Sequence, residues 1–155
     1  MFDAFAAMGV SRHPWVDAAG LKEKFREAAA KLHPDSPGGD TAAFHDLNEA
    51  FAVLRDPARR LRHLAALAYP EFAGKAAFTP NADLFARVHS ALANGDLAAV
   101  KALQQELGAR LKRLDESLPQ IPPDPQKYLT AAAEYTFLQK WSDQLRERAF
   151  RLSNR

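Results

Sequence analysis

The chain has 155 residues, of which 47% are hydrophobic and 26% charged, and its formal net charge is +2. This composition supports a packed core and excludes a disordered chain, while the weak and scattered positive charge argues against a nucleic-acid-binding protein. The absence of cysteine excludes disulfides, thiolate metal sites and a cysteine nucleophile, and it fits a cytoplasmic location. No apolar stretch is long enough to span a membrane and the first residues do not resemble a secretory signal, so no membrane association is expected.

Four helices are predicted in the N-terminal half, because apolar residues there recur at spacings of three and four. A short helix covers about residues 2–9, and a second covers about 18–32, between an Asp17 N-cap and Pro34. A third begins at Asp40 or Thr41 and ends near residue 55, and a fourth runs from Asp56-Pro57 to about residue 69. The expected inner faces of the second, third and fourth helices are Leu21, Phe25, Ala28 and Leu32; Phe44, Leu47, Phe51 and Leu54; and Leu61, Leu64 and Leu67.

The C-terminal half is predicted to form three more helices after an irregular segment at residues 71–80. They cover about 81–93, 96–117 and 126–151, and a proline-rich connector at 118–125 is expected to be non-helical. The chain is therefore predicted to be all-α, with one domain at residues 1–70, a linker at 71–80 and a three-helix bundle at 81–155.

The tripeptide His33-Pro34-Asp35 lies between two predicted amphipathic helices, with a short helix before the pair and an Asp-Pro-initiated helix after it. This order, over about residues 1–67, resembles the J-domain of DnaJ (Hsp40) co-chaperones, in which a helix hairpin carries His-Pro-Asp at its tip. The resemblance implies that these three residues engage an Hsp70-family chaperone and stimulate its ATP hydrolysis. It also implies that basic residues of the preceding helix meet an acidic Hsp70 surface; here they are Lys22, Lys24, Arg26 and Lys31.

Two positions depart from the usual J-domain pattern, because Glu27 and Ser36 stand where basic residues are common. Both weaken the basic patch and put the choice of Hsp70, or the affinity for it, in question. Other interpretations stay open for these residues: the basic side chains can be a solvated helix face with i,i+4 pairs, and the tripeptide can be an ordinary helix end followed by a turn.

A J-domain followed by a small helical bundle resembles the HscB/Hsc20 family, whose members deliver an iron–sulfur cluster scaffold protein to an Hsp70. The stretch Phe137-Leu138-Gln139-Lys140-Trp141 is similar to that family's Phe-Leu-Asp-Lys-Leu. The resemblance implies a client-binding face on the first and last bundle helices, formed here by Leu84, Phe85, Val88 and Phe137. Arg87, His89 and Ser90 replace the acidic residues of the family pattern, and whether the apolar candidates form this face or the core stays open.

The sequence contains no pattern that indicates an enzyme, a metal site or a cofactor. The five histidines lack metal-ligand spacing, and there is no nucleophile elbow, phosphate-binding loop or dinucleotide-binding glycine motif. The predicted function is therefore that of an Hsp70 co-chaperone that delivers a client, with an iron–sulfur scaffold as the expected client. The alternatives are a J-protein for another client and a helical adaptor that does not activate Hsp70.

Overall fold

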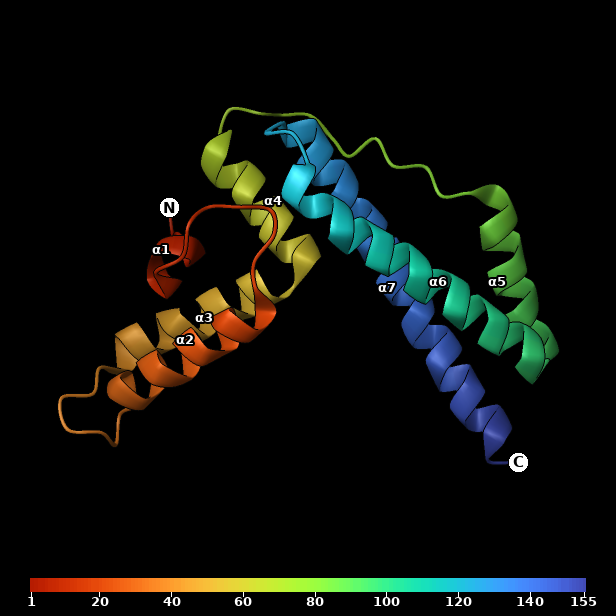
Figure 1. Ribbon diagram of the computed structural model, residues 1–155, viewed down its shortest axis with the longest axis horizontal. Helices are drawn as coiled ribbons and strands as arrows, with labels where there is room; N and C mark the ends of the chain where they lie inside the picture. The colour runs from red at the N-terminus through yellow and green to blue at the C-terminus, as the bar shows by residue number, and fades with distance from the viewer.

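The computed structural model describes all 155 residues as seven α-helices and one 3₁₀ turn, without a β-strand (Figure 1), which confirms the all-α prediction. No helix combines the length and the apolarity that crossing a membrane requires. The elements are α1 (Ala4–Met8), α2 (Ala18–Leu32), α3 (Thr41–Arg55), α4 (Pro57–Ala68), α5 (Ala82–Asn94), α6 (Leu97–Ser117), the 3₁₀ turn η1 (Leu118–Gln120) and α7 (Pro125–Ser153).

Each α-helix begins at a side chain that accepts a hydrogen bond from backbone N–H groups of the first turn, which otherwise lack partners. The predicted cap Asp17 is confirmed, and of the two candidates for α3 the structure selects Asp40, which accepts from the Ala43 N–H. Asn81 caps α5 in the same way. The remaining helices are capped by Asp3 (α1), Asp56 (α4), Asp96 (α6) and Asp124 (α7).

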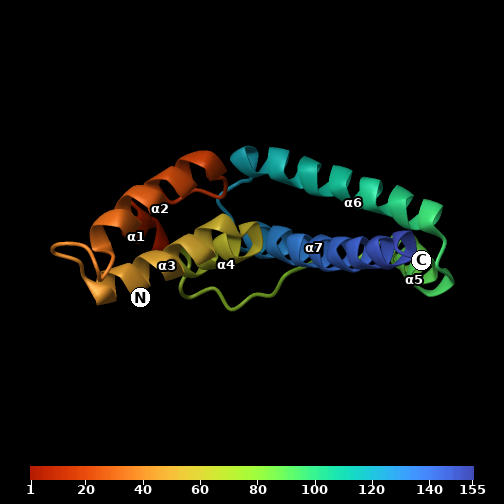
Figure 2. The ribbon, with the colours of Figure 1, turned by 90° about the horizontal axis from the view of Figure 1, so that it is seen from below.

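The helices form two arms that diverge from a shared corner (Figure 1). The antiparallel pair α2 and α3 makes one arm, and α6 and α7, with α5 beside them, make the other. At the corner α4 packs along the N-terminal part of α7. Viewed from below, the N-terminal end of α2 lies close to the C-terminal end of α6 (Figure 2). The tip of the hairpin and the distal end of the bundle therefore point away from each other.

One hydrophobic core crosses the expected domain boundary. A cluster of 17 buried residues joins α1–α4 to the start of α7 and to Leu118, and α7 contributes Tyr128, Ala131, Ala132 and Tyr135. A second cluster of 9 buried residues holds α5, α6 and the C-terminal half of α7 together. The segment at 71–80 is irregular. The start of α7 packs into the core of α1–α4, and the same helix then continues into the bundle.

The connector at 118–125 is partly helical, contrary to the prediction. Leu118 is fully buried and begins the 3₁₀ turn η1, in which the Ile121 N–H donates to the Leu118 carbonyl at 3.2 Å. Pro119 is tolerated because the N–H that proline lacks has no partner at the start of such a turn. Burial of the Leu118 side chain thus stabilises a turn that was not predicted from the proline-rich sequence.

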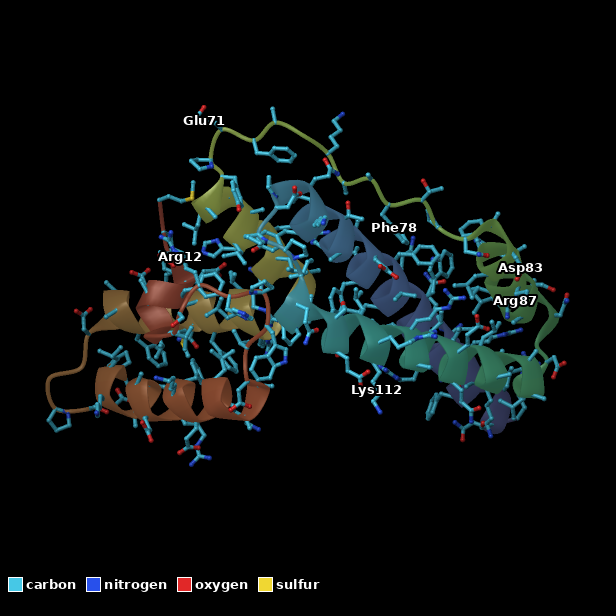
Figure 3. The ribbon with its side chains drawn as sticks, turned by 45° about the horizontal axis from the view of Figure 1, so that its top comes forward. Arg12, Glu71, Phe78, Asp83, Arg87 and Lys112 are labelled. Atoms are coloured by element: carbon cyan, nitrogen blue, oxygen red, sulfur yellow. The ribbon has the colours of Figure 1, made fainter.

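The segment between α4 and α5, hereafter the strap (residues 70–81), runs over α7 without secondary structure (Figures 1 and 3). The Ala77 N–H donates to Thr130 Oγ1 at 3.1 Å, and the Gln126 side-chain amide donates to the carbonyl of Lys75. Farther along, the Phe78 ring lies 5.6 Å from the Phe137 ring, centroid to centroid. The strap is therefore attached to α7 at several points along its length.

His63 of α4 links α1 to the core in a way that depends on its neutral form. Its Nε2 accepts a hydrogen bond from the Ala4 N–H at 3.1 Å, and its ring stacks on Phe5. Burial lowers the pKa of His63 below the ordinary value of 6.5, and the opposing attraction of the Asp3 carboxylate is smaller. As the pH falls, the unfolded chain binds this proton before the folded chain does.

We therefore expect the free energy of unfolding to decrease as the pH falls through the ordinary histidine pKa of 6.5 and below it, because the pKa of the folded chain is the lower one. Urea denaturation at a series of pH values measures the free energy of unfolding across this range. In His63→Gln the amide oxygen still accepts from Ala4 but does not titrate, so the slope in this window should flatten. His45→Gln, which replaces an exposed histidine on α3, is the matched control. A slope in His63→Gln equal to that of this control would refute the assignment.

Candidate functional site

The hairpin of α2 and α3 is held together by apolar contacts on the facing sides of the two helices. Leu21 and Leu47 are buried, and the rings of Phe25 and Phe51 stack at a centroid distance of 4.3 Å. Of the predicted α2 stripe, Leu21 alone is fully buried; Phe25, Ala28 and Leu32 are half-buried and pack against the core. The hairpin is thus a thin two-helix projection, which carries its connecting loop away from the rest of the protein.

The backbone at the tip is closed by hydrogen bonds on both sides of the predicted motif. The His33 N–H donates to the Ala29 carbonyl at 2.9 Å and completes α2, after which Pro34 prevents another helical turn. The Ser36 N–H then donates to the His33 carbonyl at 2.9 Å, and the Asp40 N–H donates to the Leu32 carbonyl at 3.1 Å. The tip is therefore a turn of defined shape rather than an open loop.

His33 and Asp35 are exposed but oriented relative to each other. The Asp35 N–H donates to His33 Nδ1 at 3.2 Å, and the imidazole ring packs edge-on against Phe44 at 5.3 Å. Because Nδ1 accepts this bond, the neutral ring carries its proton on Nε2, which remains free to donate to a partner. The Asp35 carboxylate is 91% exposed and 3.7 Å from Nδ1. The tip therefore presents a donor and an anion side by side.

Ser36 has a structural role that the sequence did not reveal. Its hydroxyl donates to the Ala30 carbonyl at 2.8 Å, and this carbonyl lies in the last turn of α2, where carbonyls lack helical partners. In the sequence Ser36 is notable only as the absence of a positive charge. The signal that could have found this role is a hydroxyl residue placed just after a proline-terminated helix, where it can fold back on the helix end.

The four predicted basic residues are all exposed along α2. Arg26 pairs with Glu23 at 3.3 Å, and Lys24 Nζ lies 3.4 Å from the Gly9 carbonyl. Lys31 lies in the last turn, next to the tip, whereas Lys22 lies roughly 16 Å from His33 along the helix at 1.5 Å per residue. The structure therefore spreads this charge over the length of the helix, with one cation at the tip itself.

Gly39 is required by the close approach of the loop to its own start. A Cβ at this position would lie 2.0 Å from the His33 carbonyl oxygen, and that oxygen is fixed by its bond to the Ser36 N–H. We expect Gly39→Ala to lower the free energy of unfolding by about 2 kcal/mol and to displace His33. Urea denaturation and the amide chemical shifts of the loop measure the two effects.

Gly108 in α6 is the matched control, because a Cβ there meets no atom within 4 Å. Gly108→Ala should raise the free energy of unfolding by about 0.5–1 kcal/mol, since alanine loses less backbone freedom in a helix. If Gly39→Ala were as harmless as Gly108→Ala, the close contact at the tip would not exist.

The predicted client-binding residues divide into two groups. Leu84 and Val88 are 2% and 1% exposed and belong to the core of the bundle, so of the two interpretations left open the structure places their side chains inside. Phe85 is 43% exposed and packs against Trp141, at a centroid distance of 5.7 Å. Phe137 is half-buried because it contacts the Trp141 ring on one side and the strap residue Phe78 on another.

Arg87, which replaces an acidic residue of the family pattern, is neutralised within the protein. Its guanidinium binds Glu106 of α6 at 2.7 Å and Asp83, one turn earlier in α5, at 2.9 Å (Figure 3). The hydrogen bonds from Arg87 lower the pKa of Glu106 to about 2, outweighing the effect of burial. Arg87 therefore connects α5 to α6, and it does not give this face a free positive charge.

The structure contains an antiparallel helix pair with an exposed His-Pro-Asp turn at its tip, a short helix before the pair and an Asp-Pro-initiated helix after it. This is the arrangement that the resemblance to the J-domain predicts. Comparison with known families agrees: residues 3–63 match the family described as the DnaJ domain. This part of the chain is therefore similar to the DnaJ domain, and the match does not extend to α5–α7.

Several curated proteins are similar to part of the chain. Protein SIS1 of Saccharomyces cerevisiae is 47% identical over 53 residues, which are 34% of this chain and 14% of SIS1. Chaperone protein DnaJ of Hyphomonas neptunium is 44% identical over 61 residues (37% of this chain, 15% of that protein), and that of Caulobacter vibrioides is 46% identical over 63 residues (39% and 16%). The chain thus spans less than a fifth of the length of these relatives, and no solved structure matches it.

Proposed function

We propose that this chain is a co-chaperone that binds an Hsp70-family chaperone through the tip of the α2–α3 hairpin and stimulates its ATP hydrolysis. The observation that carries the proposal is the tip itself. His33 and Asp35 are held in a fixed mutual orientation and remain exposed at the far end of one arm. A rigid, projecting and polar turn of this kind serves recognition better than it serves stability, because its side chains contribute little to the core.

The basic side chains of α2 support an electrostatic contribution to the encounter. Lys22, Lys24, Arg26 and Lys31 are exposed, and exposed charges of one sign accelerate association with a surface of opposite sign. Glu27 and Ser36 lower the positive charge near the tip. We therefore expect the association rate to fall with rising salt, but less steeply than for a J-domain with a denser basic patch.

The experiment is single-turnover ATP hydrolysis by a purified bacterial Hsp70, measured with and without the full chain. The proposal predicts an acceleration on the order of tenfold, which corresponds to about 1.4 kcal/mol of the barrier. The assay is repeated with a panel of Hsp70 proteins. If the rate of ATP hydrolysis by each of them did not depend on the concentration of the chain, the chain would instead be a helical adaptor that does not activate Hsp70.

We further propose that the bundle presents an exposed aromatic face to a client protein, which the chain delivers to Hsp70. The proposed client is an iron–sulfur cluster scaffold protein. Support for the face comes from Phe85, which stands over Trp141 and His89 with 43% of its surface exposed. Exposed aromatic residues over a buried aromatic base are frequent anchors of protein interfaces. Support for the scaffold comes from the resemblance of residues 137–141 to the HscB/Hsc20 pattern. A J-protein for another client is the alternative.

Binding of a purified iron–sulfur scaffold protein to the full chain, measured by calorimetry, tests the client. Phe85→Ala should weaken this binding without destabilising the bundle, and so should Phe137→Ala if the client displaces Phe78. Phe150→Ala is the control, because Phe150 is 70% exposed near the end of α7 and lies outside the aromatic face. Wild-type protein that does not bind the scaffold leaves the co-chaperone proposal intact but removes the scaffold as its client.

A further inference from the structure

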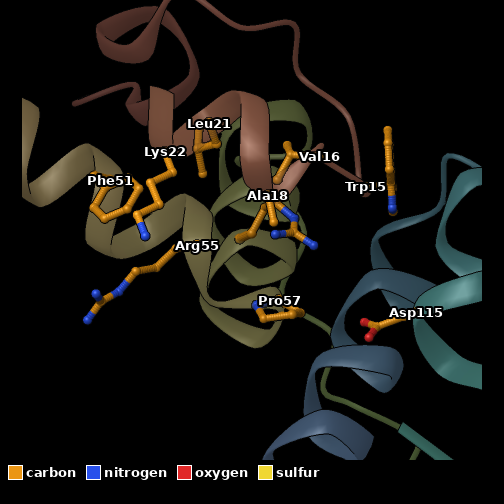
Figure 4. A pocket seen from close by; sticks show the side chains of 10 residues that line it. Trp15, Val16, Ala18, Leu21, Lys22, Phe51, Arg55, Pro57 and Asp115 are labelled. Carbon is orange, nitrogen blue, oxygen red and sulfur yellow. The ribbon is translucent and has the colours of Figure 1, made fainter. Parts of the chain in front are cut away.

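A cavity of about 410 Å³ lies at the corner where the two arms meet (Figure 4). The loop before α2, the N-terminal end of α2, the end of α3, the start of α4 and the end of α6 all contribute to it. Its apolar wall is formed by Trp15, Val16, Leu21, Phe51 and Pro57. The cavity is far from the tip, since Leu21 and His33 are roughly 18 Å apart along α2 at 1.5 Å per residue.

The polar lining of this cavity is mainly cationic. Lys22, Arg55 and Arg60 line it, and none of the three forms an ion pair within the protein. Arg55 is held near the wall, with its guanidinium 5.7 Å from the centre of the Phe51 ring. The single carboxylate, Asp115, already accepts a hydrogen bond from the Tyr135 hydroxyl. The cavity therefore carries unpaired positive charge beside apolar surface.

Trp15 lines the cavity with an apolar side chain that is partly exposed to solvent. It is 46% exposed, although the loop that carries it is fixed: its N–H donates to His13 Nδ1 at 3.1 Å, and the neighbouring Pro14 carbonyl accepts from Arg60 at 2.7 Å. A large aromatic side chain on a fixed loop loses little conformational freedom on binding, which favours its use in recognition.

We infer that this corner cavity binds an extended acidic segment of the client protein that carries a bulky apolar side chain. The apolar side chain would lie against the apolar wall of the cavity beside Trp15, and the flanking carboxylates would pair with Arg55 and Lys22. Charge complementarity selects this occupant, since a neutral apolar segment would leave the cations unpaired. The inference rests on the proposed function for the existence of a client. The cavity does not include the tip residues, and Lys22 is the one residue that it shares with the basic side chains proposed to meet Hsp70.

The test uses the full chain and a fluorescein-labelled peptide in which two leucines are flanked on each side by two glutamates. Fluorescence anisotropy should show saturable binding. A peptide with glutamines in place of the glutamates should bind at least about tenfold more weakly. Arg55→Glu and Trp15→Ala should each weaken binding of the acidic peptide by about tenfold or more, whereas Lys101→Glu, an exposed cation at the distal end of α6, should have no effect.

Arg55→Gln provides a second variant that removes the cation without adding a negative charge, and thermal unfolding of each variant shows that the fold is kept. The absence of saturable binding, equal binding of the two peptides, or binding that Arg55→Gln leaves unchanged would overturn the inference. So would preferential binding of RNA or of vesicles containing anionic lipid in place of the peptide. The Hsp70 assay without peptide is independent of these outcomes, so failure of the cavity and failure of the co-chaperone proposal are distinguishable.

Discussion

Arg60→Ala is expected to lower the free energy of unfolding by about 3 kcal/mol, because two buried carbonyl groups would lose their only donor and a cavity would form. Arg60 is 4% exposed; its Nε donates to the Pro14 carbonyl at 2.7 Å and its Nη1 to the Leu54 carbonyl at 2.6 Å. The side chain thus joins the loop before α2 to the end of α3. For a small domain this loss is a large part of the total stability.

The neighbouring Arg59 is the matched control. It lies on the same helix but is exposed, and its main contact is a 3.0 Å ion pair with Glu49. Exposed ion pairs contribute about 0–1 kcal/mol, so Arg59→Ala should change the stability little. Urea denaturation of the two variants under the same conditions decides the matter. Equal losses for the two arginines would contradict the role assigned to Arg60.

His33→Gln is expected to abolish the stimulation of Hsp70 ATP hydrolysis while leaving the fold intact. The proposed role of His33 depends on the Nε2 donor, which the hydrogen bond from the Asp35 N–H and the contact with Phe44 orient. Glutamine is flexible and cannot reproduce this geometry. Because the His33 side chain is 49% exposed, we expect its replacement to change the free energy of unfolding by less than about 1 kcal/mol.

In the single-turnover assay, His45→Gln is the control, since His45 is exposed on α3 and makes no hydrogen bond within the protein. It should stimulate like the wild type. Stimulation by His33→Gln that equals that of His45→Gln would show that the hairpin, if it acts at all, does not act through this side chain.

The helix boundaries could be predicted from the sequence because they depend on local chemistry. An aspartate before an apolar run accepts hydrogen bonds from the free N–H groups of a helix start, and a proline at the first helical position has no N–H to satisfy. Asp17, Asp56 and Asp124 cap their helices as expected. The projection of the hairpin and the motif at its tip follow from the same signals, since Pro34 ends one helix and Asp40 begins the next.

Contacts between distant parts of the chain could not be predicted in this way. Arg60 lies four residues before Leu64, on the inner face of α4, but nothing in the sequence places the Pro14 carbonyl beside it. Tyr135 is buried in the N-terminal core, and Phe78 contacts Phe137. Both contacts join residues that lie far apart in the sequence. These contacts depend on how the arms pack, which helical periodicity does not specify.

The surface of the chain that Hsp70 contacts can be mapped residue by residue. Amide signals of isotope-labelled chain, recorded with and without ATP-bound Hsp70, report which residues are affected. We expect the changes to concentrate at residues 33–36 and on the exposed side of α2, with the distal ends of α6 and α7 unaffected. Changes confined to α5–α7, with the signals of His33 and Asp35 unaltered, would contradict it.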